Sequence, residues 1–449
     1  MNHANRSTGF LHWVFVAMLA MVALTVLVSG RDLSLVLNDL EAGIPVVVQH
    51  PAIAWGQRAV SLLLLLVSAQ RIVSHFMGRK DLPSPLLALV FIAYWLATVA
   101  SPAVFGSHPQ LAHEYLYTLA IGVAAVLAGP DEFEKVLATC RNALLLFLLG
   151  GVLLIPVNPA IVIDTSYSQG LLPGVPRLGG LAPHPVALGM FAQTALLCLW
   201  CRPFQRRWLT ALGWLLGGAT LFLAQSKNAW IAFFLCSICM LAVRHGANLW
   251  RRLGDPREGA LGVFVCLVMI AIALVLMGSF LLGDVTEQAA GFLNSAEGAQ
   301  LMTLTGRDRI WAVAIEEWQG NPLFGYGPGL WDADFRASIG MPNATNAHNQ
   351  FMDTLARSGA VGATALVLYS AVLLVMSVRY AKATGGFSLA LFLALALRSI
   401  SEVPLLLFGY GAELFGHLLL IVTLASAAAG ARAQGAPAAR PHSIYRVAS

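Results

Sequence analysis

Long apolar stretches separated by short polar segments recur along this chain of 449 residues. A helix needs about 20 apolar residues to cross the hydrocarbon core of a bilayer. Stretches near that length recur from residue 10 to residue 426. We therefore predict an all-α, polytopic membrane protein of about twelve spans, at residues 10–29, 54–76, 86–105, 115–129, 143–163, 184–201, 208–225, 229–246, 260–282, 359–378, 386–401 and 403–426.

Two parts of this prediction rest on weaker sequence. The stretch 54–76 contains Arg58 and Arg71 near its ends, where long side chains can reach out of the bilayer. The last two stretches are divided only by Ser401 and Glu402. The first stretch stays a predicted span, because it is longer than the apolar core of a signal peptide and lacks a convincing small-residue cleavage site after it.

The long polar segment 283–358 carries two amphipathic helical patterns. In the first, after Gly306, the apolar residues Trp311, Ala314 and Ile315 recur at helical spacing. The segment then passes through the Gly- and Pro-rich run NPLFGYGPG, which demands a tight turn. We therefore expect a structured, helical loop before the last three spans.

The second pattern covers residues 346–362. Asn346 is the predicted N-cap, His348 falls in the first turn, and Gly359 is a natural C-terminal break. A helix N-terminus favours the neutral imidazole, which is the form that can accept a proton. His348 is therefore a candidate general base, although a histidine that caps a helix or packs at a membrane interface is the alternative.

Composition agrees with a membrane protein. Hydrophobic residues make up 58% of the chain and charged residues 11%, whereas about a quarter of the residues are charged in a soluble domain. The tail at 427–449 is small and basic and is expected to be disordered. The predicted parts are an N-terminal transmembrane bundle at 1–163, central spans with substrate-facing turns at 164–282, a catalytic loop at 283–358, C-terminal spans at 359–426, and this tail.

The basic residues predict the orientation of the spans. Cytoplasmic segments carry an excess of Lys and Arg. With the N-terminus in the cytoplasm, the inside segments hold Arg79, Lys80, Arg202, Arg206, Arg207, Arg244, Arg251, Arg252, Arg257, Arg379, Lys382, Arg432, Arg440 and Arg446. We therefore predict that both termini are cytoplasmic and that the segment 283–358 lies outside.

Two motifs that can bind metals have simpler interpretations here. The pairs Cys198–Cys201 and Cys236–Cys239 lie within apolar spans without His or carboxylate neighbours, so they are expected to pack as small hydrophobic residues. The run at 332–334 has the D-x-D form that holds a divalent ion on a nucleotide sugar, but it falls on the predicted outer side. We predict no metal site.

Several charged residues are candidates for a substrate site. Arg177, His184, Lys227, Arg307 and Arg309 are all predicted on the outer side, together with His348. A neutral base among cations suits an anionic, diphosphate-bearing substrate that enters from the bilayer.

Another pair of charged residues leaves two interpretations open. Arg398 and Glu402 lie four residues apart at a predicted span end. They form either a functional site or one structural pair.

These motifs resemble those of the bacterial O-antigen ligases, which share a C-terminal domain with O-antigen polymerases and bacterial O-oligosaccharyltransferases. His348-Asn349, nine further residues and then Gly359-Ala360-Val361-Gly362 fit the ligase signature. The run SKNAW at 226–230 is similar to the Ser-Arg motif of the family, but Lys227 stands where Arg is usual. GRDRIW resembles its second Arg motif, and NPLFGYGPG the turn that follows. The likeness covers about 177–362.

The resemblance implies a glycosyltransferase in the bacterial inner membrane with a periplasmic active site. It would transfer a polysaccharide from undecaprenyl diphosphate to a sugar hydroxyl of lipid A-core, with inversion and without metal, other cofactor or nucleic acid. His348 would act as the base and Asn349 would orient the site, with His184 and Gly359 as supporting residues. Lys227, Arg307 or Arg309, and Arg177 would hold the diphosphate.

Three alternatives remain open at this point. An O-antigen polymerase would use the same donor and a second lipid-linked glycan as acceptor, and a protein O-oligosaccharyltransferase would glycosylate protein. A flippase or transporter would place its functional residues at the bilayer midplane, whereas the candidates here gather at one face. Arg307 and Arg309 diverge by about 200° on a helix, so both are not expected to touch the same phosphate.

Overall fold

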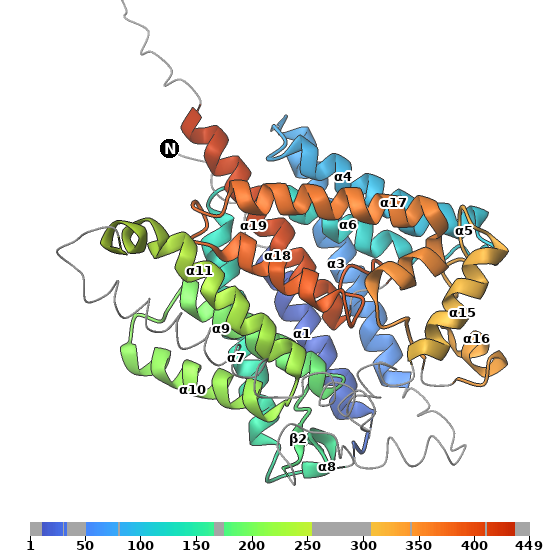
Figure 1. Ribbon diagram of the computed structural model, residues 1–449, viewed down its shortest axis with the longest axis horizontal. Helices are drawn as coiled ribbons and strands as arrows, with labels where there is room; N and C mark the ends of the chain where they lie inside the picture. The colour runs from blue at the N-terminus through green and yellow to red at the C-terminus, as the bar shows by residue number, and fades with distance from the viewer. Residues whose placement is uncertain are drawn as a thin grey trace, which may run out of the picture.

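The computed structural model describes residues 11–29, 31–33, 51–79, 81–165, 175–253, 307–341, 344–408 and 411–435. This part of the chain is mostly helical (Figure 1). Its only strands, β1 (Ile163–Asp164) and β2 (Arg177–Leu178), form one short antiparallel pair with Ile163 opposite Leu178. The all-α prediction is thus confirmed for the described residues.

The described residues form the following helices. In chain order they are α1 (Leu11–Val28), α3 (Pro51–Met77), α4 (Pro85–Trp95), the π-helix η1 (Leu96–Ala100), α5 (Ser101–Phe105), α6 (Tyr115–Val126), α7 (Glu132–Leu153), α8 (Pro159–Val162), α9 (Pro185–Cys201), α10 (Arg207–Leu223), α11 (Lys227–Leu253), α15 (Arg307–Gly320), α16 (Ala333–Ser338), α17 (Gln350–Arg379), α18 (Phe387–Arg398) and α19 (Ala412–Gly435).

Seven helical segments of the described chain are long and apolar enough to cross a membrane. They are α1, most of α3, α4 to α5, α7, the first part of α11, α17 and α19. The apolar helices α6, α9 and α18 are shorter, and the predicted span 260–282 lies outside the described residues. The protein is therefore a multi-pass membrane protein, while the number of about twelve spans stays a prediction.

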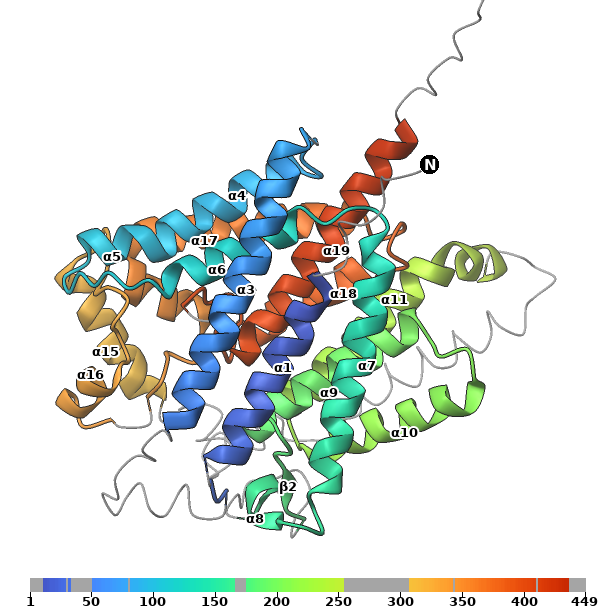
Figure 2. The same ribbon diagram turned by 180° about the vertical axis from the view of Figure 1, so that it is seen from behind.

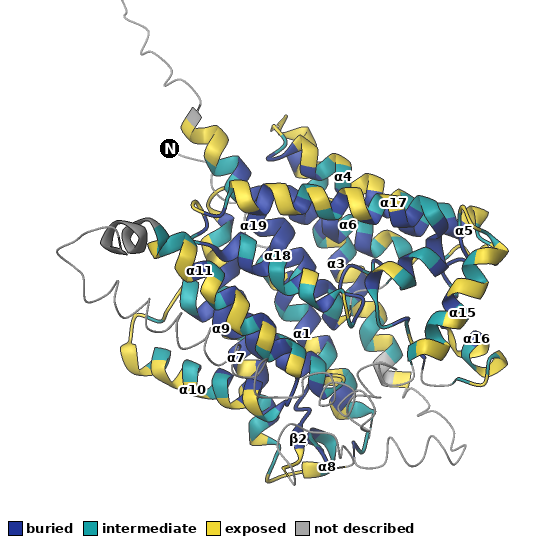
Figure 3. Cartoon of the chain, in the orientation of Figure 1, coloured by how far each residue is buried: buried dark blue, intermediate teal, exposed yellow. Residues whose placement is uncertain are grey.

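Helix α19 lies at the centre of the bundle. It is buried over most of its length and contacts α1, α6, α7, α9 and α18 (Figure 3). Its sequence is rich in Ala and Gly, and small residues let helix backbones approach closely in a membrane. Buried Thr423 donates its hydroxyl to the carbonyl of Leu419 at 2.7 Å, so this polar group does not disturb the packing.

Helix α7 begins and ends about ten residues before the predicted span 143–163. The hydropathy pattern excluded the charged residues around Glu132, but Glu132 is buried and forms a bidentate ion pair with Arg71 of α3, with N–O distances of 2.5 and 2.8 Å. A neutralised pair can lie at a helix end inside the bundle, so charge did not mark the end of the helix.

Helix α19 also differs from the prediction. It begins at Ala412 rather than at residue 403, because residues 399–408 form turns and irregular structure instead of a helix. It continues to Gly435, so residues 427–435, which were expected to belong to a disordered tail, are helical.

The two sequence motifs that can bind metals in other proteins have structural roles in the described chain. Cys198 and Cys236 are buried with free thiols in α9 and α11, as expected from packing. Asp332 is the N-cap of α16, where its Oδ1 accepts a hydrogen bond from the backbone N–H of Phe335 at 2.8 Å. The sequence did not predict this short helix.

Helix α17 carries the largest departure from the predicted elements. Gly359 does not end the helix but kinks it, with φ 60° and ψ −162°, and the chain continues as a helix to Arg379. The N-cap is Asn349, whose Oδ1 accepts a hydrogen bond from the N–H of Met352 at 3.0 Å, and not Asn346. The boundary expected at residue 359 between loop and span therefore lies inside one helix.

The turn at 322–327 fills the gap in hydrogen bonding that the kink opens. The carbonyl groups of Ala356 and Arg357 accept from the N–H groups of Tyr326 and Gly327 at 2.8 and 3.0 Å. In the other direction, the N–H groups of Ala360 and Val361 donate to the carbonyl groups of Pro322 and Leu323 at 2.8 and 3.2 Å. These four bonds attach the turn to α17 and leave no space between them: a Cβ on Gly359 would lie 2.3 Å from the carbonyl carbon of Leu323.

We predict that Gly359→Ala destabilises the protein. The combination of positive φ and extended ψ at Gly359 is essentially restricted to glycine and costs about 1–3 kcal/mol for a residue with a Cβ, and the contact with Leu323 adds to that cost. The measurement is the thermal unfolding midpoint of the detergent-purified protein. Gly218→Ala in α10 is the matched control, because a Cβ there meets no atom within 4 Å. Equal midpoints for the two variants would contradict the prediction.

Candidate active site

His348 lies immediately before the N-cap of α17, in a strained backbone conformation. Its φ is 48°, and its N–H donates to Oδ1 of Asn346 at 2.8 Å. Few residues other than glycine adopt a positive φ, and such residues are concentrated at functional sites. The expectation that His348 occupies the first helical turn is wrong by two positions, so the argument from the helix terminus does not apply to it as predicted.

The carboxylate of Glu402 is the acidic neighbour of His348. Nδ1 of His348 lies 3.5 Å from Oε2 of Glu402, an electrostatic contact longer than an ordinary hydrogen bond. The side chains are 29% and 11% exposed. A carboxylate beside Nδ1 orients the ring and leaves Nε2 as the atom that can accept a proton.

Opposing effects act on the charge of Glu402. Burial raises the pKa of its carboxyl group. The contact with His348 and the proximity of His184 and Arg398 lower the pKa by more than burial raises it, so the net pKa lies below its ordinary value. Glu402 is therefore ionised at neutral pH. An ionised carboxylate can stabilise the imidazolium that forms when His348 accepts a proton.

Backbone contacts hold the segment of Glu402 against the start of α17. The N–H of Gln350 donates to the carbonyl of Ser399 at 2.9 Å, and Oε1 of Gln350 accepts from the N–H of Leu405 at 2.7 Å. Nδ2 of Asn349 lies 3.3 Å from the carbonyl of Ile400. The two residues after His348 therefore fix the position of the segment that carries Glu402.

The start of α11 approaches the same segment. Nδ2 of Asn228 donates to Oγ of Ser401 at 2.7 Å. Lys227, the first residue of α11, is exposed next to this contact. Arg177 in β2 is buried and donates through Nε to the carbonyl of Ala224 at 3.2 Å, so the turn between α10 and α11 brings Arg177 and Lys227 into one region.

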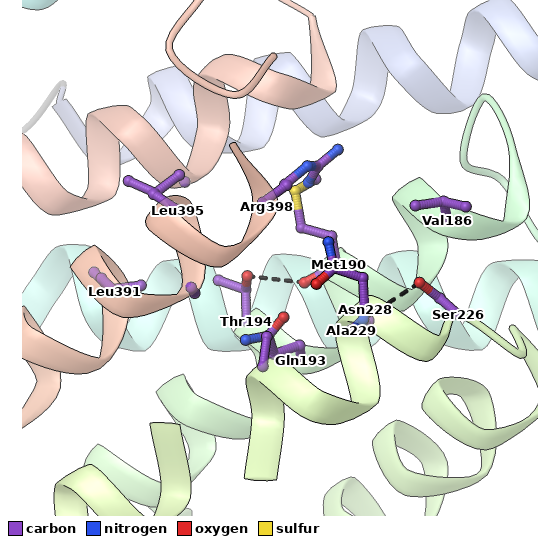
Figure 4. Close-up of a pocket in the computed structure, with 13 residues that line it drawn as sticks. Val186, Met190, Gln193, Thr194, Ser226, Asn228, Ala229, Leu391, Leu395 and Arg398 are labelled. Carbon is purple, nitrogen blue, oxygen red and sulfur yellow. Dashed lines mark hydrogen bonds between the residues drawn. The ribbon is translucent and has the colours of Figure 1, made fainter. Parts of the chain in front are cut away.

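Arg398 pairs with Glu413 and not with Glu402. Its Nη2 lies 2.5 Å from Oε1 of Glu413, so the interpretation of Arg398 and Glu402 as one structural pair is wrong. Arg398 is 6% exposed, and its Nε and Nη1 have no hydrogen-bond partner among the described residues. The guanidinium lines a narrow cavity with Asn228 and Ser226 (Figure 4). A buried cation with unused donors can bind a further anionic group.

His184 contributes no positive charge to the site, in contrast to the prediction. It is the N-cap of α9, where its Nδ1 accepts from the N–H of Ala187 at 3.3 Å. Burial, with the help of the nearby Arg398, lowers the pKa of His184 to about 4 against the opposing effect of Glu402. The ring is therefore neutral at pH 7.

The first turn of α15 separates Arg307 from Arg309. Nη2 of Arg309 is directed to the carbonyl of Ile339, at 3.5 Å, beyond the end of α16. Arg307 is partly buried on another side of the helix. Trp311 donates its indole N–H to the carbonyl of Ala347 at 2.8 Å, which fixes α15 next to His348. Figures 1 and 2 show α15 and α16 beside the start of α17.

Two residues that support His348 were missed in the sequence. Asp353 accepts the N–H of Ala347 through Oδ1 at 3.0 Å and pairs with Arg357 through Oδ2 at 2.8 Å. Arg357 also donates to the carbonyl of Pro328 at 2.9 Å. The spacing of four residues on a helix was a visible signal for this ion pair. No comparable signal joined Glu402 to His348, because 53 intervening residues separate them.

The comparison with known families agrees with these motifs. Residues 211–367 match the family model described as O-antigen ligase, and no curated protein matches the sequence. The matched region contains Lys227, Arg307, His348 and Gly359, whereas Glu402 lies beyond its end. This match supports the chain as a member of the O-antigen ligase family.

Proposed function

We propose that this protein is an O-antigen ligase that transfers a polysaccharide from undecaprenyl diphosphate to a sugar hydroxyl of lipid A-core, at the periplasmic face of the bacterial inner membrane. The contact between His348 and Glu402 carries the proposal, because it supplies an oriented base. The O-antigen ligase match and the membrane-spanning helices support it.

The reaction is an inverting displacement at the anomeric carbon of the donor. Nε2 of His348 removes the proton of the acceptor hydroxyl while the oxygen of that hydroxyl attacks the anomeric carbon. The bond from the anomeric carbon to the diphosphate oxygen breaks, and the diphosphate leaves with the electron pair. The ionised Glu402 stabilises the imidazolium, and Asn349 keeps the Glu402 segment in place.

Cations stabilise the leaving group. Negative charge grows on the diphosphate as the bond breaks, so positive groups at that position lower the barrier. Lys227, Arg177 and Arg307 are the proposed contacts. Arg398 is a fourth, because it is buried and two of its nitrogen atoms are free of hydrogen-bond partners among the described residues. With the charge neutralised, diphosphate leaves without a protonating acid.

The first test is transfer by the purified protein from a lipid-linked donor to lipid A-core with EDTA present. We expect product from the wild type and a loss of about 10²–10⁴-fold in rate for His348→Ala, the usual range for removal of a general base. His245→Ala, at an exposed position in α11, is the control.

Other outcomes of this assay separate the alternatives. Near-normal turnover by His348→Ala would contradict its role as the base. Elongation of lipid-linked glycan without a core-linked product would identify a polymerase, and glycan on a protein acceptor an oligosaccharyltransferase. Dependence on added divalent metal would contradict the metal-free mechanism.

A second prediction concerns Glu402 as a positioning residue. Glu402→Gln keeps the shape of the side chain but removes its charge, so we expect kcat to fall at least about 10-fold while the KM for donor stays within about twofold. The double variant with His348→Ala should be no slower than His348→Ala alone, because the two residues act as a unit. Multiplicative losses of kcat would show that Glu402 acts independently of His348.

A third prediction separates the two arginines of α15. We expect Arg307→Ala to lower kcat/KM for the donor about 10-fold or more, which corresponds to about 1.4 kcal/mol. Arg309→Ala should change it less than about threefold, because its guanidinium is directed to Ile339. Each variant is the control for the other, and a larger loss for Arg309→Ala would reverse the assignment.

A further inference from the structure

A cleft of about 1000 Å³ opens between α1, α3 and the start of α6. Its volume is far larger than that of a few water molecules and suits part of a substrate. The proposed contacts for the donor diphosphate do not line it, which leaves its ligand open.

The wall that α1 contributes to the cleft changes from apolar to polar along the helix. Met21, Val22 and Val26 of α1 line the cleft, and Ser29 and Arg31, just beyond the end of this helix, line it as well. Helix α3 forms the opposite wall and exposes Leu62, Leu63 and Leu66 on its surface, as expected for a helix in contact with lipid. An amphipathic ligand can therefore reach the cleft from the bilayer.

The charged groups of the cleft favour an anion. Arg31 donates to four backbone carbonyl groups, of Ile161, Gly180, Ala182 and Pro183, which are neutral acceptors. Burial lowers the pKa of Arg31 to about 10, so it keeps its charge at pH 7. Arg58 is exposed and lies 5.3 Å from the centre of the Trp55 ring. Glu114 is the carboxylate of the described lining, and it lies 3.7 Å from His113.

One end of the cleft reaches the proposed active site. Pro183, which lines it, directly precedes His184, and Ala412, which also lines it, directly precedes Glu413, the partner of Arg398. In an inverting displacement, the nucleophile and the leaving group lie on opposite faces of the anomeric carbon, so the two substrates need separate binding surfaces. The cleft offers a surface that none of the proposed diphosphate contacts lines.

We propose that this cleft docks the acceptor, an anionic glycolipid whose lipid chains lie against α1 and α3 and whose phosphate groups face Arg58 and Arg31. The inference rests on the proposed function for the identity of the acceptor, but binding of a phosphorylated glycolipid can be measured without the reaction.

The first test fills the cleft. Ala54 lines it, whereas Ala59 on the same helix is exposed and does not belong to the described lining. We expect Ala54→Trp to raise the KM for lipid A-core at least about 10-fold and to leave the KM for the lipid-linked donor within about twofold. Ala59→Trp should resemble the wild type. An increase in the donor KM, or no change in either KM, would overturn the proposal.

The second test removes one charge and keeps the cleft open. Arg58→Gln should raise the KM about 3–10-fold for phosphorylated lipid A-core, the effect of about 1 kcal/mol from one exposed ion pair. With an enzymatically dephosphorylated acceptor, wild type and Arg58→Gln should have equal KM values. An equal effect of the variant on both acceptors would show that Arg58 does not contact phosphate and would overturn the proposed orientation.

Direct binding separates this proposal from the proposed function. The probe is a bisphosphorylated, acylated glucosamine disaccharide added to the detergent-purified protein, with native mass spectrometry as the readout. Binding by the wild type that Ala54→Trp weakens at least about 10-fold supports the cleft even where no glycan transfer occurs, and in that case only the proposed function fails. Equal binding by both proteins overturns the cleft, whatever the transfer assay gives.

Discussion

The structure around His348 depends on one constraint: backbone polar groups buried in a membrane protein must find partners inside the protein. The kink at Gly359 interrupts the hydrogen bonding of α17, and the turn at 322–327 satisfies the carbonyl and N–H groups on both sides of it. The same turn contacts the segment that follows α5, since the N–H groups of Ser107 and His108 donate to the carbonyl groups of Gly325 and Tyr326. A local break in one helix thereby joins three parts of the chain.

This junction determines the position of the residues in the candidate active site. The first segment of α17 begins after the Asn349 cap and ends at the kink, so its position decides where His348 lies. Trp311 and Asp353 hold the backbone of Ala347 from two sides, and Gln350 holds the connection that brings in Glu402. The strained backbone of His348 persists because these contacts determine the conformation of the residues beside it.

Burial then decides how each charged group can act. His184 is buried at a helix start and stays neutral, whereas Glu402 stays ionised because positive and polar neighbours outweigh its burial. Arg398 is buried beside Glu413 and keeps two nitrogen atoms free of partners among the described residues, and Lys227 is exposed at the start of α11. Residues that look equivalent in the sequence therefore have different roles in the proposed reaction.

The sequence by itself determined the class of fold, because apolar length and helical periodicity are local properties. It indicated the α15 helix, the turn at 322–327 and His348 as a candidate base, and its motifs led to the O-antigen ligase family, which the match at 211–367 supports. Only the tertiary structure decided that Glu402 meets His348, that Arg398 pairs with Glu413, and that Gly359 kinks a continuous helix. These features depend on contacts between residues far apart in the chain, or on hydrogen bonds from another segment, and periodicity contains no information about either.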